Sequence, residues 1–269
     1  MHVIRRSLVF KSVLGTVLLL LPLGNMPAQD AKPAVEDDYY PLLTLPIPEG
    51  VVLEASALEM MSGGTLAVAS RRGDIYLVEN PLSPSAETMK FNLFAGGLHE
   101  ILGLARKGEG LFVTQRCEVT RVLDTNKDQL ADLFETVSDG WEINGDYHEY
   151  AFGSRHDRDG NIWVVLCLTG SFNSNSKYRG WCLRITPEGK VIPTCSGIRS
   201  PGGIGMNAAG DMFYTDNQGP WNGTCSLKHL RPGSFQGHPA GNRWYEITEA
   251  IGPRPPDPAS GSRIMVEAD

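Results

Sequence analysis

The sequence of 269 residues has few cysteines, no excess of basic residues and only one long apolar run. Its 24 Lys and Arg against 31 Asp and Glu give a net charge of −7, which argues against a nucleic-acid-binding surface. Helical periodicity is missing over any long window, so a helical fold is not expected. Hydrophobic residues still make up 41% of the chain, which is ordinary for a globular protein and argues against extended disorder.

The apolar run lies near the N-terminus, from Val13 to Leu23. It follows a basic start and precedes Ala28, a small residue suited to cleavage, which is the layout of a secretory signal. The run is short for a membrane-spanning helix, and an uncleaved anchor is the alternative. We therefore expect a signal peptide at 1–28, a linker at 29–44, no membrane span after cleavage, and a secreted or periplasmic protein.

The five cysteines are scattered, and neither CxxC nor CxxCH occurs, so the chain holds neither a redox pair of that type nor a covalent haem motif. An odd number leaves at least one cysteine of an exported protein unpaired or paired outside the chain. Cys182 has two candidate local partners, Cys195 and Cys167, and the sequence does not choose between them.

A repeat predicts the fold class. Four segments begin with a glycine turn and continue as a strand of β-branched and aromatic residues: Gly73–Val78, Gly110–Thr114, Gly160–Val165 and Gly210–Thr215. Strands at a period of about 40–50 residues are typical of β-propeller blades. We expect an all-β propeller of four-stranded blades over 45–269, with about four to five blades present. A β-sandwich is the alternative, and the missing closing strand suggests the first part of a longer propeller.

An acidic loop has the spacing of a calcium-binding loop. Its oxygen ligands stand at loop positions 1, 3, 5, 7, 9 and 12, with Leu130 offering its carbonyl: Asp124, Asn126, Asp128, Leu130, Asp132 and Glu135. The sixth position holds Gln129 where a glycine normally makes the sharp turn. The sequence predicts a structural Ca²⁺ site between strands, and a polar turn without metal is the alternative.

Residues 145–163 and 197–221 resemble the glucose/sorbosone dehydrogenase family of six-bladed secreted propellers, some of which use pyrroloquinoline quinone (PQQ). Residues 230–239 resemble the large secreted dehydrogenase-like proteins of planctomycetes and their relatives, in several of which further domains, including a haem-binding one, follow the propeller. The resemblance implies oxidation of a sugar or aldose hydroxyl, PQQ and Ca²⁺ as cofactors, and a haem-containing electron acceptor as a partner.

The resemblance also implies site residues. His148 occupies the position of the family's general base, and a histidine suits that role because it titrates near neutral pH. Arg199 matches the arginine that binds the anionic quinone, and Gln218, Gly219 and Pro220 match a turn whose carbonyls bind calcium. Ser200 replaces the family's asparagine, and no acidic residue follows Pro220 closely. These departures leave a non-catalytic propeller that binds a carbohydrate or protein partner as the alternative.

Overall fold

The computed structural model describes residues 33–249 and 251–258. The chain divides into two units, Met1–Leu42 and Leu43–Asp269. The described part of the first unit contains a short 3₁₀ helix, η1 (Glu36–Asp38). The expected signal peptide lies outside the described residues. Within the described ranges, no helix has the length and apolar character needed to cross a membrane.

The second unit is built from four antiparallel sheets, each formed by strands that follow one another in the chain. The first sheet contains β1 (Ala55–Met60), β2 (Leu66–Ser70), β3 (Ile75–Glu79) and β4 (Lys90–Ala95). The second contains β5 (Gly103–Lys107), β6 (Gly110–Thr114), β7 (Val119–Leu123) and β8 (Leu133–Ser138). The third contains β9 (Ala151–His156), β10 (Ile162–Leu166), β11 (Trp181–Ile185) and β12 (Val191–Ser196). The fourth contains β13 (Pro201–Met206), β14 (Met212–Asp216) and β15 (Ser226–His229).

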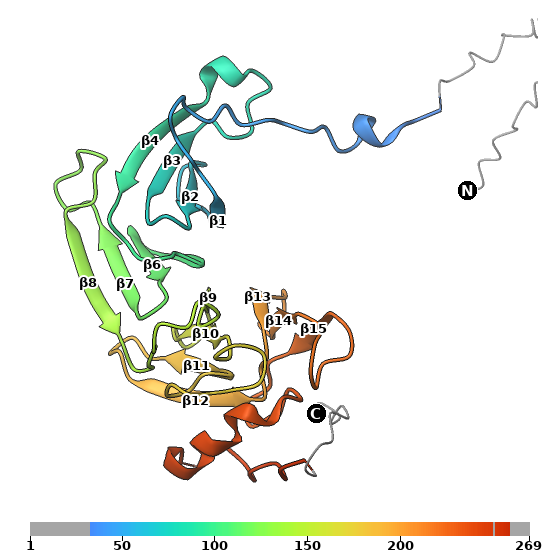
Figure 1. The fold of residues 1–269 in the computed structure, drawn as a ribbon. Coiled ribbons are helices and arrows are strands. Elements are labelled where there is room, and N and C mark those ends of the chain that lie inside the picture. Colours follow the sequence, from blue (N-terminus) through green and yellow to red (C-terminus); the bar gives the residue numbers. More distant parts are fainter. Residues whose placement is uncertain (1–32, 250, 259–269) are drawn as a thin grey trace, which may run out of the picture. The chain divides into compact units, whose positions relative to one another are not determined.

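The sheets are the blades of a β-propeller, numbered 1 to 4 in chain order (Figure 1). The first strands of successive blades contact one another, β1 with β5, β5 with β9, and β9 with β13. Two 3₁₀ helices complete the second unit, η2 (Ala86–Thr88) in blade 1 and η3 (Pro239–Ile247) after blade 4. This arrangement confirms the predicted all-β propeller.

The predicted repeat treated the four glycine turns as equivalent, which is wrong for blade 1. Gly160 and Gly210 lie between the first and second strands of their blades and Gly110 is the first residue of β6, whereas Gly73 lies between the second and third strands of blade 1. The equivalent turn in blade 1 contains Gly64, at φ +84°. Both glycines form turns before strands, so the local pattern alone could not distinguish them.

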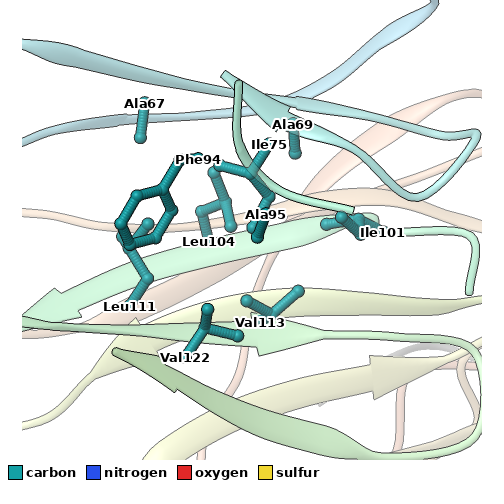
Figure 2. Packing of buried hydrophobic residues seen from close by; sticks show 10 residues of the cluster. All are labelled: Ala67, Ala69, Ile75, Phe94, Ala95, Ile101, Leu104, Leu111, Val113 and Val122. Atoms are coloured by element: carbon teal, nitrogen blue, oxygen red, sulfur yellow. The ribbon is translucent and has the colours of Figure 1, made fainter. Parts of the chain in front are cut away.

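The blades are held together by buried apolar layers between neighbouring sheets. Figure 2 shows the layer between blades 1 and 2, which includes Phe94, Ile101 and Leu111. A second layer is centred on Trp181, and a third lies between blades 3 and 4 around Trp163 and Tyr214. Each fully buried aliphatic or aromatic side chain contributes about 1.5–3 kcal/mol of transfer free energy, so these layers supply the main stabilisation of the propeller.

The inner strands approach so closely that side chains are excluded at one point. A Cβ on Gly103 of β5 would lie 2.1 Å from the carbonyl carbon of Gly153 of β9. The Gly153 N–H donates to the carbonyl of Leu102 at 3.4 Å. Blades 2 and 3 therefore meet backbone to backbone, and glycine is required by space.

The antiparallel order places loops at two ends of the blades. The end where each blade's first strand begins is called the top here. Top loops precede β5, β9 and β13 and also connect second to third strands, while the other hairpins lie at the bottom. His148, Arg199 and Gln218–Pro220 are consequently at the top, and the acidic loop between β7 and β8 is at the bottom.

Candidate functional site

His148 lies in the top loop that precedes β9, with 37% of its side chain exposed. Its Nδ1 is 3.1 Å from Oδ1 of Asp146, and the same oxygen accepts the His148 backbone N–H at 2.9 Å. The ring of Tyr147 lies beside the imidazole, with the ring centroids 3.8 Å apart. Nε2 makes no hydrogen bond to any residue in the described part of the chain.

The Asp146 carboxylate determines which nitrogen of the neutral His148 ring carries the proton. The His148 backbone N–H lowers the pKa of Asp146, and the contact with the imidazole lowers it further. An ionised carboxylate only accepts hydrogen bonds, so Nδ1 carries the proton of the neutral ring. Nε2 then holds a lone pair and can take up a proton, which is what a general base requires.

Arg116 joins the His148 loop to the corresponding loop of blade 2. Its Nη1 donates to Oε2 of Glu100 at 2.8 Å, and its Nη2 donates to the Asp146 backbone carbonyl. Glu100 directly follows His99, which occupies the position in blade 2 that His148 occupies in blade 3. Arg116 is only 9% exposed, so solvent screens this ion pair less than it would a surface pair.

Arg199 emerges between β12 and β13 and is 9% exposed. Its Nη1 donates to the Asn217 carbonyl at 3.2 Å and its Nη2 to Oγ of Ser171 at 3.4 Å, while Nε is buried without a partner. Within the described ranges, no carboxylate lies within salt-bridge distance of this guanidinium. The charge of Arg199 is therefore met only by neutral acceptors.

The segment that follows β10 links Arg199 to the His148 loop. The backbone of its Gly170 lowers the pKa of the Asp146 carboxyl, and the neighbouring Ser171 contacts Arg199. The Leu168 N–H donates to the Arg199 carbonyl at 3.0 Å. The structure thus brings the predicted base and the predicted anion-binding arginine to one segment at the top of blade 3.

The predicted Gln218-Gly219-Pro220 turn lies against Arg199. A Cβ on Gly219 would be 2.2 Å from Cζ of Arg199, so only glycine allows the guanidinium its place. The Gly219 carbonyl accepts the Asn222 N–H at 3.0 Å, and the Gly219 N–H donates to the Asn222 carbonyl at 2.7 Å. Gln218 is exposed, and Pro220 is half-buried. Asn222 therefore closes a tight turn at the place where the resemblance implies carbonyls open to calcium.

Glu149, which follows His148 in the sequence, is a buried acidic residue that stabilises the loop by hydrogen bonds. Glu149 has an exposed fraction of 0%, and its oxygens accept the Asn144 N–H at 2.6 Å and the Thr169 hydroxyl. Burial lowers the pKa of the adjacent Arg179 to about 10, with Glu149 acting in the opposite direction. Arg179 donates to the carbonyls of Glu142, Tyr150 and Arg116. These bonds fix the backbone on both sides of His148.

The acidic loop at the bottom is ordered by its own side chains. Asp124 accepts the backbone N–H groups of Lys127 at 2.6 Å and Gln129 at 2.8 Å. Asp128 accepts the Leu130 N–H at 2.9 Å, and Asp132 accepts the N–H and hydroxyl of Thr125.

The last predicted ligand of this loop points elsewhere. Glu135 lies on β8 and pairs with Arg121 at 3.1 Å. In the described part of the chain, no three His, Cys, Asp or Glu side chains gather closely enough to hold a metal ion. Five of the six predicted calcium ligands thus share the β7–β8 loop, whereas Glu135 is held in a separate ion pair on β8.

A cavity of about 460 Å³ lies between blades 2 and 3, lined by Lys107, Phe112, His156 and Glu188 among others. Lys107 ends β5 and Glu188 is in the β11–β12 hairpin, so this cavity is at the bottom. It is therefore separate from His148 and Arg199.

The sequence analysis missed four residues of the site: Asp146, Arg116, Ser171 and Asn217. Asp146 had a local signal, because an aspartate two residues before a histidine can accept both its backbone and its ring N–H. The other three come from loops of different blades and had no local signal.

The sequence profile of a family described as a domain of unknown function, DUF7133, matches residues 86–247. None of the curated protein sequences compared matches the chain. Solved structures do match. An oxidoreductase of glucose dehydrogenase type from Thermus thermophilus is 19% identical, with a TM-score of 0.57 over 70% of this chain and 65% of that protein. The PQQ-bound aldose sugar dehydrogenase from Streptomyces coelicolor is also 19% identical, with a TM-score of 0.54 over 70% of this chain and 63% of that protein.

A calcium-containing structure of an AA12 carbohydrate-active enzyme from Trichoderma reesei is 13% identical, with a TM-score of 0.50 over 67% of this chain and 53% of that protein. The chain thus spans less than two thirds of each of these three proteins. At such identities the likeness shows a shared propeller fold, similar to that of PQQ-dependent sugar dehydrogenases. Because the family profile covers more than half of the sequence, the chain belongs to the DUF7133 family.

Proposed function

We propose that the chain is a secreted or periplasmic propeller that oxidises a hydroxyl of a sugar or aldose, with His148 as general base and PQQ as electron acceptor. The observation that carries this proposal is the Asp146–His148 pair. Asp146 holds the proton on Nδ1 and leaves Nε2 at the top surface of blade 3 to accept the substrate hydroxyl proton. When bound, PQQ would accept the hydride from the carbon of that hydroxyl.

Arg199 fits the anionic side of a quinone cofactor. It is nearly buried, has an unpartnered Nε and lacks a carboxylate partner among the described residues. Burying an uncompensated charge is costly, so an anion beside this guanidinium would be stabilised. Ser171 and Gly219 hold its orientation from two sides.

The residues match a calcium site at the same place only in part. The Gly219 carbonyl accepts the Asn222 N–H, and the neutral Asn222 stands where the resemblance implies an acidic ligand. This disagreement favours the second candidate function, a non-catalytic propeller that binds a carbohydrate or protein partner. If the chain is active, the resemblance adds a haem-containing protein as the acceptor that removes the electrons.

Titration of the purified protein with PQQ, with and without calcium, tests the first function, followed by dye-linked oxidation of aldoses. We expect saturable PQQ binding that Arg199→Ala weakens at least tenfold. His148→Gln should keep PQQ binding and lose turnover by about 10²–10⁴-fold. His99→Gln is the matched control, because it changes the corresponding loop of blade 2 and should leave both unchanged. Absence of PQQ binding by a folded protein would reject the quinone function and leave the binding function.

We also propose a structural calcium site in the Asp124–Asp132 loop. The loop bridges two blades, because its Ala131 N–H donates to the Phe94 carbonyl of blade 1 at 2.7 Å. In this structure Asp124, Asp128 and Asp132 accept backbone N–H groups; a cation that drew these carboxylates together would neutralise their charge and secure this bridge. Asp128→Ala should lower the melting temperature in calcium but not in chelator. Equal melting of both proteins under both conditions would contradict the site.

A further inference from the structure

Cys182 and Cys195 face each other across two neighbouring strands of blade 3. They are directly paired residues of β11 and β12. Both belong to the buried layer between blades 3 and 4, so their side chains lie on the same face of the sheet, and both have an exposed fraction of 0%. Opposed residues of an antiparallel pair have Cα atoms about 4.5–5.5 Å apart, which falls within the range of disulfides.

The two thiols also influence each other. Burial raises the pKa of the Cys182 thiol well above its usual range, and the neighbouring Cys195 raises it further. A thiol in this environment stays protonated and unreactive once it is buried, because only the thiolate attacks a disulfide. Bond formation therefore belongs to folding, before blades 3 and 4 close over the pair.

The other cysteines are placed differently. The residue of β10 opposite Cys182 is Val165, and Cys167 lies two positions farther on, with its Sγ donating to the Arg199 carbonyl at 3.4 Å. Cys225 is exposed in the loop before β15, with its Sγ donating to Asn217. Of the two partners that the sequence left open for Cys182, the strand register therefore favours Cys195.

We propose that Cys182 and Cys195, which are free thiols in this structure, form a disulfide when the chain folds in an oxidising environment. A disulfide such as oxidised glutathione is the oxidant. One thiolate attacks it and releases one glutathione thiolate, and the second cysteine then displaces the other glutathione from the mixed disulfide. The two cysteines lose two protons and two electrons, and the oxidant becomes two glutathione thiols.

The bond would close a short loop of the chain from β11 through the hairpin to β12. A crosslink of this kind restricts the unfolded chain, and its full burial keeps reductants away from the folded protein. We expect the oxidised protein to melt on the order of 5–10 °C higher than the reduced protein.

Tryptic mapping of the whole chain, refolded in glutathione buffers, tests the proposal. Each of the two cysteines lies alone on its own tryptic peptide, Gly180–Arg184 and Val191–Arg199. After refolding with oxidised glutathione and alkylation in denaturant, the two peptides should appear joined and lighter by two hydrogen atoms than their sum. Under reducing conditions both should appear separately and alkylated.

Three controls make the outcome specific. Cys167→Ala removes another buried cysteine and should keep the joined peptides, whereas the double variant Cys182→Ala, Cys195→Ala should lose them along with the effect of oxidation on melting. Oxidation in concentrated urea gives the mixture of pairings expected without native structure. Recovery of Cys182 alkylated from the oxidised native protein, or joined to Cys167, would overturn the proposal.

Discussion

The close backbone contact between blades 2 and 3 makes a sharp prediction about Gly103→Ala. The added methyl would lie 2.1 Å from the carbonyl carbon and oxygen of Gly153, far inside van der Waals contact. Both partners are backbone atoms of inner strands, so rotation of a side chain cannot relieve the clash. We expect a loss of about 3 kcal/mol in the free energy of unfolding, at the upper end for overpacking, with a fall in melting temperature of roughly 6–12 °C.

Gly205→Ala is the matched control, because Gly205 lies on β13, the inner strand of blade 4. A Cβ there would meet no atom within 4 Å, and its φ lies outside the left-handed region. This substitution should stabilise the protein by about 0.4–1 kcal/mol through the unfolded chain. Urea and thermal unfolding of both variants measure the difference. Similar stability changes in the two variants would refute the close packing of blades 2 and 3.

Three further outcomes are expected. Burial, with a smaller contribution from the charge of Arg199, lowers the pKa of His238 to about 4, so unfolding takes up a proton between about pH 6.5 and pH 4. Stability should fall with decreasing pH in that window by at most about 1.4 kcal/mol per pH unit, and His238→Asn should flatten this part of the profile. Gln129 has φ +74°, so Gln129→Gly should raise stability by about 1 kcal/mol in chemical denaturation. Asp146→Ala removes the acceptor of the Nδ1 proton, so nitrogen NMR spectra of the neutral His148 ring should show a larger share of the Nε2-protonated tautomer; an unchanged tautomer would contradict the pairing.

Local patterns predicted the strands well because a glycine turn followed by β-branched and aromatic residues specifies a strand within a few residues. Gly110 is the first residue of β6, and Gly160 and Gly210 lie two residues before β10 and β14. In blade 1 the prediction matched Gly73 in place of Gly64 to the other turns, because both glycines are equally suited to turns. Only the pairing of β1 with β2 assigns Gly64 to the first hairpin, and pairing is a contact between segments rather than a property of either.

The candidate site was predictable to a smaller extent. His148 and Arg199 stood out by resemblance, and the structure places both at the top of blade 3 and links them through Gly170 and Ser171. The local sequence does not predict that Arg116 donates to the Asp146 carbonyl, because the two residues belong to loops of different blades. The closure of the Gly219 carbonyl by Asn222 likewise depends on the fold of the turn.

The sequence by itself determined that this chain forms repeated short strands, because turn chemistry and side-chain branching act between near neighbours. It also determined which residues could bind an anion, take up a proton or hold calcium, because those capacities belong to the side chains themselves. The tertiary structure alone decided which of them meet. Asp146 and His148 share one loop. Cys182 meets Cys195 only when β11 pairs with β12. Arg199 meets Ser171 only when the chain returns to the top of blade 3 after β12.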